Sequence, residues 1–476
     1  MQTNKIVQLA ILVILLLLSM VAVSSLLELR DNTRNVILGA GGFVIMIFLL
    51  WGNIPTDAKL LFIVILGYAL GGKGFAYISP FEPVYIGEIT LALCMLGLLA
   101  RPRQLSLFET PIHRLIWLYI LYAGIHLIVD FDSYRLLAVR DSSMVYYSLF
   151  FITAYSLFHS EKALVTFERI VRVAIALSSL SILCHIFTIG LEFPGFSPHT
   201  DAFIPLCVGL TLYLLVLGME QRKIHFLVLA CAISLALIAT KTAALLALVA
   251  AVAAAILFGR INKLIMPAII LGALSIVAIS IVAFLDKDLA TNLLSGGEAA
   301  EAFGIQSGEF VGFSGTTEWR WLWWTTISVD TMNEAPFWGQ GFGADITGPF
   351  LEAWLGPAHA DPTGYARYPH NILLTNFGRL GFIGLTIFCM LFASIGLFVL
   401  KFSRKYFCSP FRRDADLICF GVVIAGMINA VLQATYEVPY GAITHWTCLA
   451  YMAARYYLPD PERQELTEKE ESEAQT

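Results

Sequence analysis

The sequence predicts an all-α polytopic membrane protein, with about fourteen transmembrane helices and one long external loop between the eleventh and the twelfth. Hydrophobic residues make up 58% of the 476-residue chain and charged residues only 14%, and the mean hydropathy is +0.76. Water-soluble domains are far less apolar. The apolar residues also gather in runs of about 20, the length at which a helix crosses a bilayer with its backbone hydrogen bonds satisfied.

The first eleven expected spans fill residues 1–285 and the last three fill residues 370–458. The run at 6–27 is longer than the apolar core of a signal peptide, so we expect it to remain as the first span. The run at 224–258 is too long for one helix, and we expect a turn at Thr240-Lys241-Thr242. The expected spans are 6–27, 35–52, 59–78, 84–100, 112–129, 142–158, 170–190, 202–217, 224–239, 242–258, 264–285, 371–399, 415–434 and 441–457.

The basic residues between the spans predict the orientation. With the amino terminus inside, 20 of the 30 Lys and Arg residues fall in inner connections and 10 in outer ones. Positive residues are enriched on the cytoplasmic side of membrane proteins, so both termini are expected in the cytoplasm. Residues 286–369 then form an external loop with short helices. Residues 459–476 are charged and nearly free of apolar side chains, and we expect a disordered cytoplasmic tail.

The composition excludes some classes of function. The net charge is -5 and the basic residues are scattered between the spans, so no basic face is available for nucleic acid. Seven of the eight cysteines lie in apolar runs, and no Cys-x-x-Cys or Cys/His spacing occurs. We therefore expect neither a disulfide framework nor a structural zinc site.

Three basic residues on the expected outer side stand out. Lys241 lies within an apolar run, where an ammonium group is costly unless it faces a cavity or a partner. The alternative is a side chain that reaches the membrane surface from a helix end. Arg135 and Arg140 lie in the connection 130–141, where they either help to bind an anion or form a solvated rim.

The external loop carries six of the nine tryptophans. Thr316 followed by Glu318 is typical of a helix start, and Arg320, Trp324 and Ile327 then fall on one helix face. A helix of this kind anchors at the headgroup level of a membrane, but anchoring does not account for the arginine. The planar guanidinium of Arg320 suits phosphate oxygens. The aromatic residues that suggest a sugar-binding loop are Trp319, Trp321, Trp323, Trp324, Trp338, Trp354, Tyr365 and Tyr368.

Two further motifs follow this helix. Residues 336–343 read Pro-Phe-Trp-Gly-Gln-Gly-Phe-Gly, whose alternating glycines allow a tight turn with backbone amides that are able to hold an anion. Tyr368-Pro369-His370-Asn371 leads into the next span, and the proline restricts the residue before it to an extended conformation. A histidine at a helix start is more often a capping or hydrogen-bonding residue than a base, so the pattern alone leaves its role open.

Four motifs, taken in order, resemble those of the O-antigen ligase and Wzy-type O-antigen polymerase superfamily. They are T-K-T-A-A-L-L-A-L at 240–248, E-W-R-W-L-W-W at 318–324, A-P-F-W-G-Q-G-F-G at 335–343 and P-H-N-I-L-L-T-N-F-G-R-L-G-F-I-G-L at 369–385. The earlier spans match only in being hydrophobic. The resemblance implies an inverting, metal-independent glycosyltransferase that acts on undecaprenyl-diphosphate-linked sugars at the outer face of a bacterial inner membrane.

The resemblance also implies roles for single residues. The essential histidine of the family matches His370, whose type suits the deprotonation of an acceptor hydroxyl. The arginine at the head of the external helix matches Arg320, which suits stabilisation of the leaving diphosphate. Where the family has a second arginine this chain has Lys241, which keeps the charge but loses the bidentate guanidinium. Arg379, about two turns beyond His370, is expected to lie deeper and to shape the cavity.

The expected site therefore combines catalytic residues with two binding sets. The catalytic residues are His370 and Arg320, the diphosphate ligands are Lys241, Arg320, Arg140 and Arg135, and the sugar contacts are Trp324, Trp338, Tyr368 and Asn371. No metal and no cofactor are expected. The expected partners are an undecaprenyl-diphosphate-linked glycan donor, a glycan or lipid-linked acceptor, membrane lipids and other polysaccharide assembly proteins.

Three alternatives stay open. Within the superfamily a polymerase elongates a lipid-linked glycan, whereas a ligase transfers it to lipid A core or protein; we favour a polymerase, because the acidic, Trp-rich loop suits a growing glycan. A metal-dependent glycosyltransferase would use the D-x-D patterns at 130–132 and 286–288. A transporter or flippase of lipid-linked or anionic glycans would tend to show internal repeats, and none is evident.

Overall fold

The structure, a computed structural model, describes residues 54–76, 84–101, 107–187, 203–240, 242–261, 264–265, 316–348, 350 and 368–458. Every regular element within these ranges is a helix, which confirms the all-α prediction for this part of the chain. The expected spans at 6–27 and 35–52, most of the span at 264–285, and the tail lie outside the described residues. So do residues 286–315 and 351–367 of the external loop, the latter with Trp354 and Tyr365. The count of fourteen spans therefore stays a prediction.

The described helices follow the expected spans closely. They are α3 (Thr56–Ala76), α4 (Ile86–Leu99), α5 (Pro111–Tyr134), α6 (Leu136–Asp141), α7 (Ser143–Tyr146), α8 (Leu149–Leu157), α9 (Glu161–Phe187), α10 (Ile204–Gln221), α11 (Ile224–Thr240), α12 (Thr242–Leu257), α16 (Thr316–Glu334), α18 (Ile372–Tyr406), α19 (Asp414–Leu432) and α20 (Pro439–Tyr457). The long run at 224–258 forms two helices, as predicted, with α11 ending at Thr240 and α12 beginning at Thr242, and the two helices contact each other. The expected span at 142–158 is divided between α7 and α8.

Among the described helices, α5, α10, α18 and α19 are long and apolar enough to cross a membrane. α5 shows how such a helix divides its faces: Ile116 and Tyr119 are buried, whereas Leu121, Ile125 and Ile128 are exposed. The exposed residues recur at helical spacing and form an apolar stripe that suits lipid and not water. The described part of the chain is therefore all-helical, and its apolar helices are those of a membrane protein.

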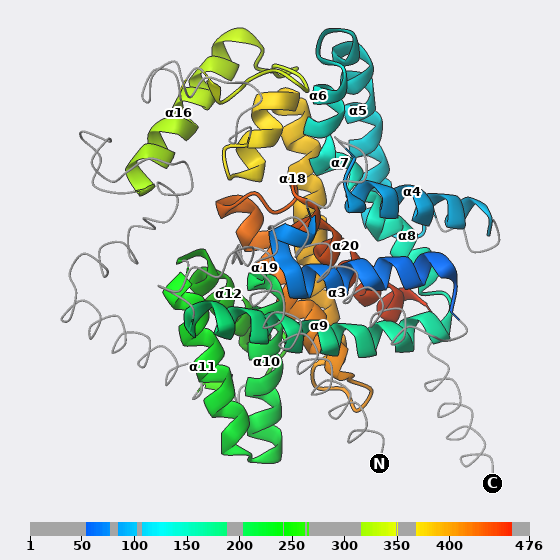
Figure 1. Cartoon of the computed structure of the whole chain (residues 1–476), viewed down its shortest axis with the longest axis vertical. Helices are drawn as coiled ribbons and strands as arrows, with labels where there is room; N and C mark the ends of the chain where they lie inside the picture. The colour runs from blue at the N-terminus through cyan, green and yellow to red at the C-terminus, as the bar shows by residue number, and fades with distance from the viewer. Residues whose placement is uncertain are drawn as a thin grey trace, which may run out of the picture.

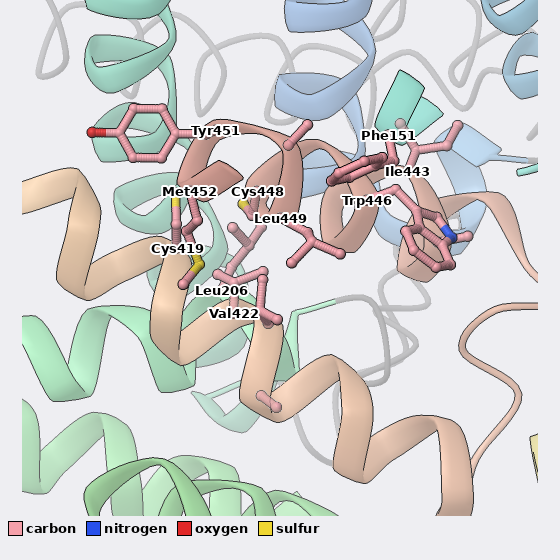
Figure 2. Packing of buried hydrophobic residues seen from close by; sticks show 14 of the residues in the cluster. Phe151, Leu206, Cys419, Val422, Ile443, Trp446, Cys448, Leu449, Tyr451 and Met452 are labelled. Carbon is pink, nitrogen blue, oxygen red and sulfur yellow. The ribbon is translucent and has the colours of Figure 1, made fainter. Parts of the chain in front are cut away.

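A continuous hydrophobic core surrounds α20. Figure 2 shows Trp446 and Leu449 of this helix among Phe151 of α8, Leu206 of α10 and Val422 of α19. These side chains are fully or almost fully buried, and between helices in a bilayer such residues stabilise the fold through close van der Waals packing. The core fixes both α19 and α20, and with them the connection 433–438 that joins the two helices.

α18 runs through the middle of the molecule, with α16 and α6 near its amino-terminal end and α10 and α11 near the opposite end (Figure 1). α5 packs along α18. The hydroxyl of Tyr119 donates a hydrogen bond to Oδ1 of Asn376 (2.6 Å), and that of Tyr122 donates to the carbonyl oxygen of Leu380 (3.0 Å). The amino-terminal end of α18 is thus where three segments that are distant in sequence meet.

Candidate functional site

The turn that begins α18 carries the candidate base. Asn371 caps the helix, because its Oδ1 accepts hydrogen bonds from the amides of Leu373 (3.0 Å) and Leu374 (3.3 Å). His370, directly before the cap, has a φ of 52°. Few residues other than glycine adopt this left-handed conformation, and residues held in it gather at functional sites. The backbone at His370 is therefore held in a special conformation between a proline and a helix cap.

α16 packs against this turn through two adjacent tryptophans. Nε1 of Trp324 donates a hydrogen bond to the carbonyl oxygen of Pro369 (2.8 Å). The buried indole of Trp323 meets the imidazole of His370 edge-on, with ring centroids 6.3 Å apart. The helix begins at Thr316, as predicted. The aromatic residues of α16 therefore help to fix the position of His370.

Arg320 lies one turn before Trp324 on the same helix. Its side chain is partly buried, and Nη1 donates to the carbonyl oxygen of Leu432 at 3.4 Å. Leu432 is the last residue of α19. The guanidinium group of Arg320 therefore lies where α16, the start of α18 and the α19–α20 connection come together.

The residue before Pro369 contacts the segment that links α6 and α7. The hydroxyl of Tyr368 donates to the carbonyl oxygen of Arg140 (3.4 Å) and lies 3.5 Å from Oγ of Ser143. Burial, with the nearby carboxylate of Asp141, raises the pKa of Tyr368 to about 12. This hydroxyl therefore stays protonated at neutral pH and remains a hydrogen-bond donor.

The structure connects the other predicted diphosphate ligands less directly with the His370 turn. Arg135 is exposed at the end of α5, where it pairs with Asp132 (3.5 Å) and lies over the ring of Phe131. Arg140 is also exposed, and its backbone carbonyl joins it to Tyr368 and so to the His370 turn. Lys241 lies outside the described residues. The roles of these three cations in binding a diphosphate stay predictions.

A turn from the external loop bridges a break in α18. At Gly381 the helix departs from helical geometry with a φ of 62°, and the turn 336–341 supplies the backbone partners that the helix loses. The hydrogen bonds run from Gln340 N to Gly378 O (2.7 Å), Gly341 N to Arg379 O (3.0 Å), Phe382 N to Pro336 O (2.8 Å) and Ile383 N to Phe337 O (3.4 Å). We call residues 336–341 and 378–383 together the glycine clasp.

The glycines of the clasp are required by the close approach of two backbones. A Cβ atom on Gly381 would overlap the main chain of Phe337, and one on Gly339 would overlap the main chain of Arg379. A broken helix at membrane depth is tolerated only where its backbone groups find other partners. The two glycine-containing motifs of the sequence, which lie about forty residues apart, are therefore the two halves of one structure.

Protein carboxylates bind the amides that follow the turn. The amide of Phe342 donates to Oδ2 of Asp130 (2.7 Å), and that of Gly343 donates to Oδ2 of Asp141 (3.1 Å). Arg379 completes the arrangement, since its Nη2 lies 3.0 Å from Oδ2 of Asp141 and both side chains are fully buried. These two amides are therefore not available to an external anion, in contrast to the prediction from the alternating glycines.

The same contacts bear on the metal-dependent alternative. Asp130 belongs to the clasp, whereas Asp132 points outward with 90% of its side chain exposed. No group of three or more His, Cys, Asp or Glu residues is arranged to hold a metal ion within the described part of the chain. The second D-x-D pattern, at 286–288, lies outside the described residues.

Trp338 is placed apart from the other predicted sugar contacts. Its indole stacks on the buried imidazole of His126, with ring centroids 3.8 Å apart, and meets Tyr122 edge-on. Both partners belong to α5, at the level of the glycine clasp. Trp324, Tyr368 and Asn371 lie instead at the His370 turn. Sequence order alone did not separate these two locations.

Two residues that the sequence analysis did not single out also belong to this end of α18. Thr375 lies one turn after Asn371, and its hydroxyl is 3.0 Å from Oε1 of Glu437. Glu437 is almost fully buried in the α19–α20 connection. The signal that was available is a carboxylate in a short connection between two apolar spans, on the side where the other site residues were expected.

Comparison with known families agrees with the motifs. The family described as O-antigen ligase matches residues 226–389, a region that includes α11, α12, α16 and the first half of α18 with Arg320 and His370. A comparison with curated proteins gives no match. The resemblance predicted from the four motifs is thus confirmed: residues 226–389 of this membrane protein match the O-antigen ligase family.

Proposed function

We propose that the chain is an inverting glycosyltransferase that joins an undecaprenyl-diphosphate-linked oligosaccharide to an acceptor glycan at the outer face of the bacterial inner membrane. In this proposal it acts as a polymerase of a surface polysaccharide such as O-antigen. The observation that carries the proposal is the junction of α16 with the start of α18. There Trp323 and Trp324 hold the turn of His370, and Arg320 lies one helical turn away.

In the proposed reaction, His370 takes the proton from the acceptor hydroxyl. Imidazole suits this step because its ordinary pKa lies close to neutral pH. The acceptor oxygen then forms a bond to the anomeric carbon of the donor, on the face opposite the diphosphate. The bond between that carbon and the diphosphate oxygen breaks, and its electron pair leaves with the diphosphate. The anomeric configuration is therefore inverted.

Arg320 stabilises the negative charge that develops on the leaving diphosphate. A guanidinium group matches phosphate oxygens in shape and charge, and a fixed cation in a partly buried site acts more strongly than one in water. Lys241, at the break between α11 and α12, supplies a second cation in this scheme. The scheme uses protein cations in the place where other glycosyltransferases use a metal ion.

The sugar contacts in the proposal come from the same turn. Trp324 and Tyr368 offer aromatic faces beside His370. Asn371 uses its Oδ1 as the helix cap, so a sugar hydroxyl would be bound through its amide nitrogen. The polyprenyl chain of the donor remains in the bilayer, against the apolar outer faces of helices such as α5.

A ligase is the second candidate, because the matching family is described as O-antigen ligase. The two activities share the donor, the base and the leaving group. They differ in the acceptor, which is a second lipid-linked glycan for a polymerase and lipid A core or protein for a ligase. The acceptor that supports transfer therefore separates the two candidates.

The test is glycan transfer by the purified full-length chain in lipid nanodiscs. The donor is a bacterial lipid extract that contains undecaprenyl-diphosphate-linked oligosaccharide, supplied alone or with lipid A core. We expect elongated lipid-linked product in the presence of EDTA. His370→Ala should lower the rate by about 100-fold or more, because general base catalysis contributes 10² to 10⁴. Arg320→Lys should lower it roughly tenfold, because the ammonium group loses the bidentate contact.

His225→Ala serves as the matched control, since His225 is exposed at the start of α11. It should leave the rate unchanged. Product that forms only with lipid A core would identify a ligase. A substantial rate in His370→Ala would remove this histidine as the base, and loss of product with EDTA alone would show that a metal ion takes part.

A further inference from the structure

Glu437 lies in the α19–α20 connection with only 3% of its surface exposed. The hydroxyl of Ser143 on α7 donates to its backbone carbonyl at 3.0 Å. Leu432, at the other end of the same connection, accepts the hydrogen bond from Arg320. The carboxyl group is thus held in a fixed backbone segment that also contacts the proposed diphosphate-binding residue.

The side chain of Glu437 reaches the first turn of α18 through Thr375. The hydroxyl oxygen of Thr375 lies 3.0 Å from Oε1 of Glu437 and 3.1 Å from the carbonyl oxygen of Asn371. A hydroxyl group has one proton to donate, yet both neighbours are oxygen atoms. The hydroxyl of Thr375 can therefore donate to only one of the two oxygen atoms at a time. Which oxygen atom accepts its proton depends on the protonation state of Glu437.

Two hydrogen-bond arrangements are possible. When Glu437 is neutral, its O–H donates to Thr375, and Thr375 donates to Asn371, so that an unbroken chain holds the residue next to His370. When Glu437 is ionised, the hydroxyl of Thr375 donates to the carboxylate. The backbone carbonyl of Asn371 then loses the hydrogen bond from the Thr375 side chain. The neutral form therefore gives the firmer first turn.

The surroundings favour the neutral form. Oε2 of Glu437 is buried and has no hydrogen-bond partner among the described residues, and an unpartnered oxygen is far less costly in a neutral carboxyl than in a carboxylate. Burial raises the pKa of Glu437 to about 7, and it outweighs the hydrogen bonds from the amides of Glu437 and Tyr436 and from Thr375, and the charge of Arg379, which favour the carboxylate. The charged and titratable groups that face it are Arg379 of α18, which pairs with Asp141, Tyr119 of α5, and Tyr436 of its own connection.

We propose that Glu437 is a positioning residue of the transfer reaction, which holds the His370–Asn371 turn through Thr375 when it is protonated and loosens that turn when it loses its proton. This inference rests on the proposed function, in which the turn carries the base. It adds a second ionisable group to the reaction. His370 must be neutral to act, which favours higher pH, whereas Glu437 must be protonated, which favours lower pH.

The first test is the pH profile of transfer from about pH 5 to about pH 9, which brackets the Glu437 pKa of about 7 and the ordinary His pKa of about 6.5. The wild-type kcat should rise and then fall, with the fall centred near the Glu437 pKa of about 7. Glu437→Gln should lose the falling limb, because its amide donates to Thr375 at every pH. Glu334→Gln, an exposed carboxyl on α16, is the matched control and should keep the wild-type profile.

The second test asks whether the effect passes through Thr375. Thr375→Val should lower kcat roughly tenfold, with the KM for the donor unchanged, because only the position of the base is altered. Adding Glu437→Gln to Thr375→Val should cause no further change, since residues in one hydrogen-bonded unit are not additive. Additive effects, or a wild-type pH profile in Glu437→Gln, would overturn the inference.

The third test does not depend on activity. A raised pKa means that the stability contributed by neutral Glu437 is fully present below the ordinary Glu pKa of about 4.3 and is lost as the pH rises through the folded-state value. The thermal midpoint of the wild type should therefore fall, relative to Glu437→Gln, between about pH 5 and about pH 8. Equal midpoints throughout would refute the inference. Absence of transfer with the expected midpoints would instead refute the proposed function.

Discussion

The two ends of α18 hold their charges in different ways. At the end where α18 finishes, which we call the inner end, arginines pair with carboxylates of neighbouring helices. The contacts join Arg413 to Glu168 (2.7 Å), Arg455 to Asp416 (3.5 Å) and Arg412 to Glu220 (2.5 Å). The hydroxyl of Tyr451 lies 3.1 Å from a carboxylate oxygen of Glu168 and 3.1 Å from one of Asp416, and it donates its single proton to one of them at a time. These side-chain pairs tie α9, α10, α19 and α20 together.

At the end where α18 begins, which we call the outer end, several charged groups bind irregular main chain. Asp130 and Asp141 accept from backbone amides beyond the glycine clasp, and Arg320 donates to a backbone carbonyl. Arg379 and Asp141 also pair, but that pair encloses the same turn. The inner-end arginines also donate to main-chain carbonyls, Arg412 to Phe407 (3.1 Å) and Arg455 to Phe411 (2.9 Å). The difference is that side-chain ion pairs link neighbouring helices at the inner end, whereas Asp130 and Asp141 at the outer end bind amides of irregular backbone.

Irregular backbone is what the proposed site requires. His370 has a positive φ, Gly381 breaks α18, and the connection at 433–438 carries Glu437. Each of these segments leaves the repeating hydrogen bonds of a helix, so each needs other partners to remain ordered. The irregular segments at the outer end therefore depend on specific contacts from distant parts of the chain.

The largest effect is expected from Arg379→Met, which removes the cation of the buried outer pair and leaves Asp141 uncompensated. Breaking one partner of a buried ion pair typically costs about 3–5 kcal/mol. We expect a marked fall in the thermal midpoint in detergent and loss of transfer. Asp141→Asn added to Arg379→Met should restore part of the midpoint, because it removes the unpaired charge. Failure of this double variant to recover would mean that the guanidinium acts mainly through its hydrogen bonds to the carbonyl oxygens of Gly341 (3.3 Å) and Ala344 (3.1 Å).

A smaller but still clear effect is expected from Gly381→Ala. The added methyl group would overlap the main chain of Phe337, and alanine is strained at a positive φ. Residues held in such conformations cost on the order of 1–3 kcal/mol. Gly124→Ala on α5 is the matched control, because a Cβ atom there meets nothing within 4 Å. If both variants unfolded at the same temperature, the glycine clasp would not be a determinant of stability.

The smallest effect is expected at the inner end, from Glu220→Gln. This variant breaks the ion pair with Arg412. The side chain of Arg412 is 20% exposed and that of Glu220 is 34% exposed. Partly exposed pairs of this kind are worth about 0–1 kcal/mol and are screened by salt. Thermal unfolding should shift by no more than a degree or two relative to wild type, with transfer unchanged. A loss as large as that of Arg379→Met would remove the contrast between the two ends.

Several features of the fold follow directly from the sequence. Runs of apolar residues gave the positions of α3, α4, α10, α11, α12, α19 and α20 to within a few residues, whereas α5 and α18 extend beyond the expected spans, to Tyr134 and Tyr406. The break at residue 241 followed from the length of a membrane span, and the start of α16 from the Thr316 helix signal. These features are local, because they depend on the residues of one segment and on the thickness of a bilayer.

Contacts between distant segments could not be predicted in the same way. The amides after Gly341 suggested an anion site, but Asp130 and Asp141 occupy them from more than 200 residues away. Trp338 looked equivalent to Trp324, yet it packs on α5 and not on the His370 turn. A sequence pattern shows which groups are available for binding, but not which protein groups have already bound them.

The sequence by itself determined that the chain is a helical membrane protein and which motifs resemble the O-antigen ligase family, because hydrophobic spans and short motifs are written in consecutive residues. Tertiary structure alone decided that Gly339 meets Gly381, that Arg320 contacts the end of α19, and that Glu437 reaches Thr375. Each of these contacts joins segments from different parts of the chain. They depend on how the helices pack, and packing depends on the shapes of all the buried side chains at once.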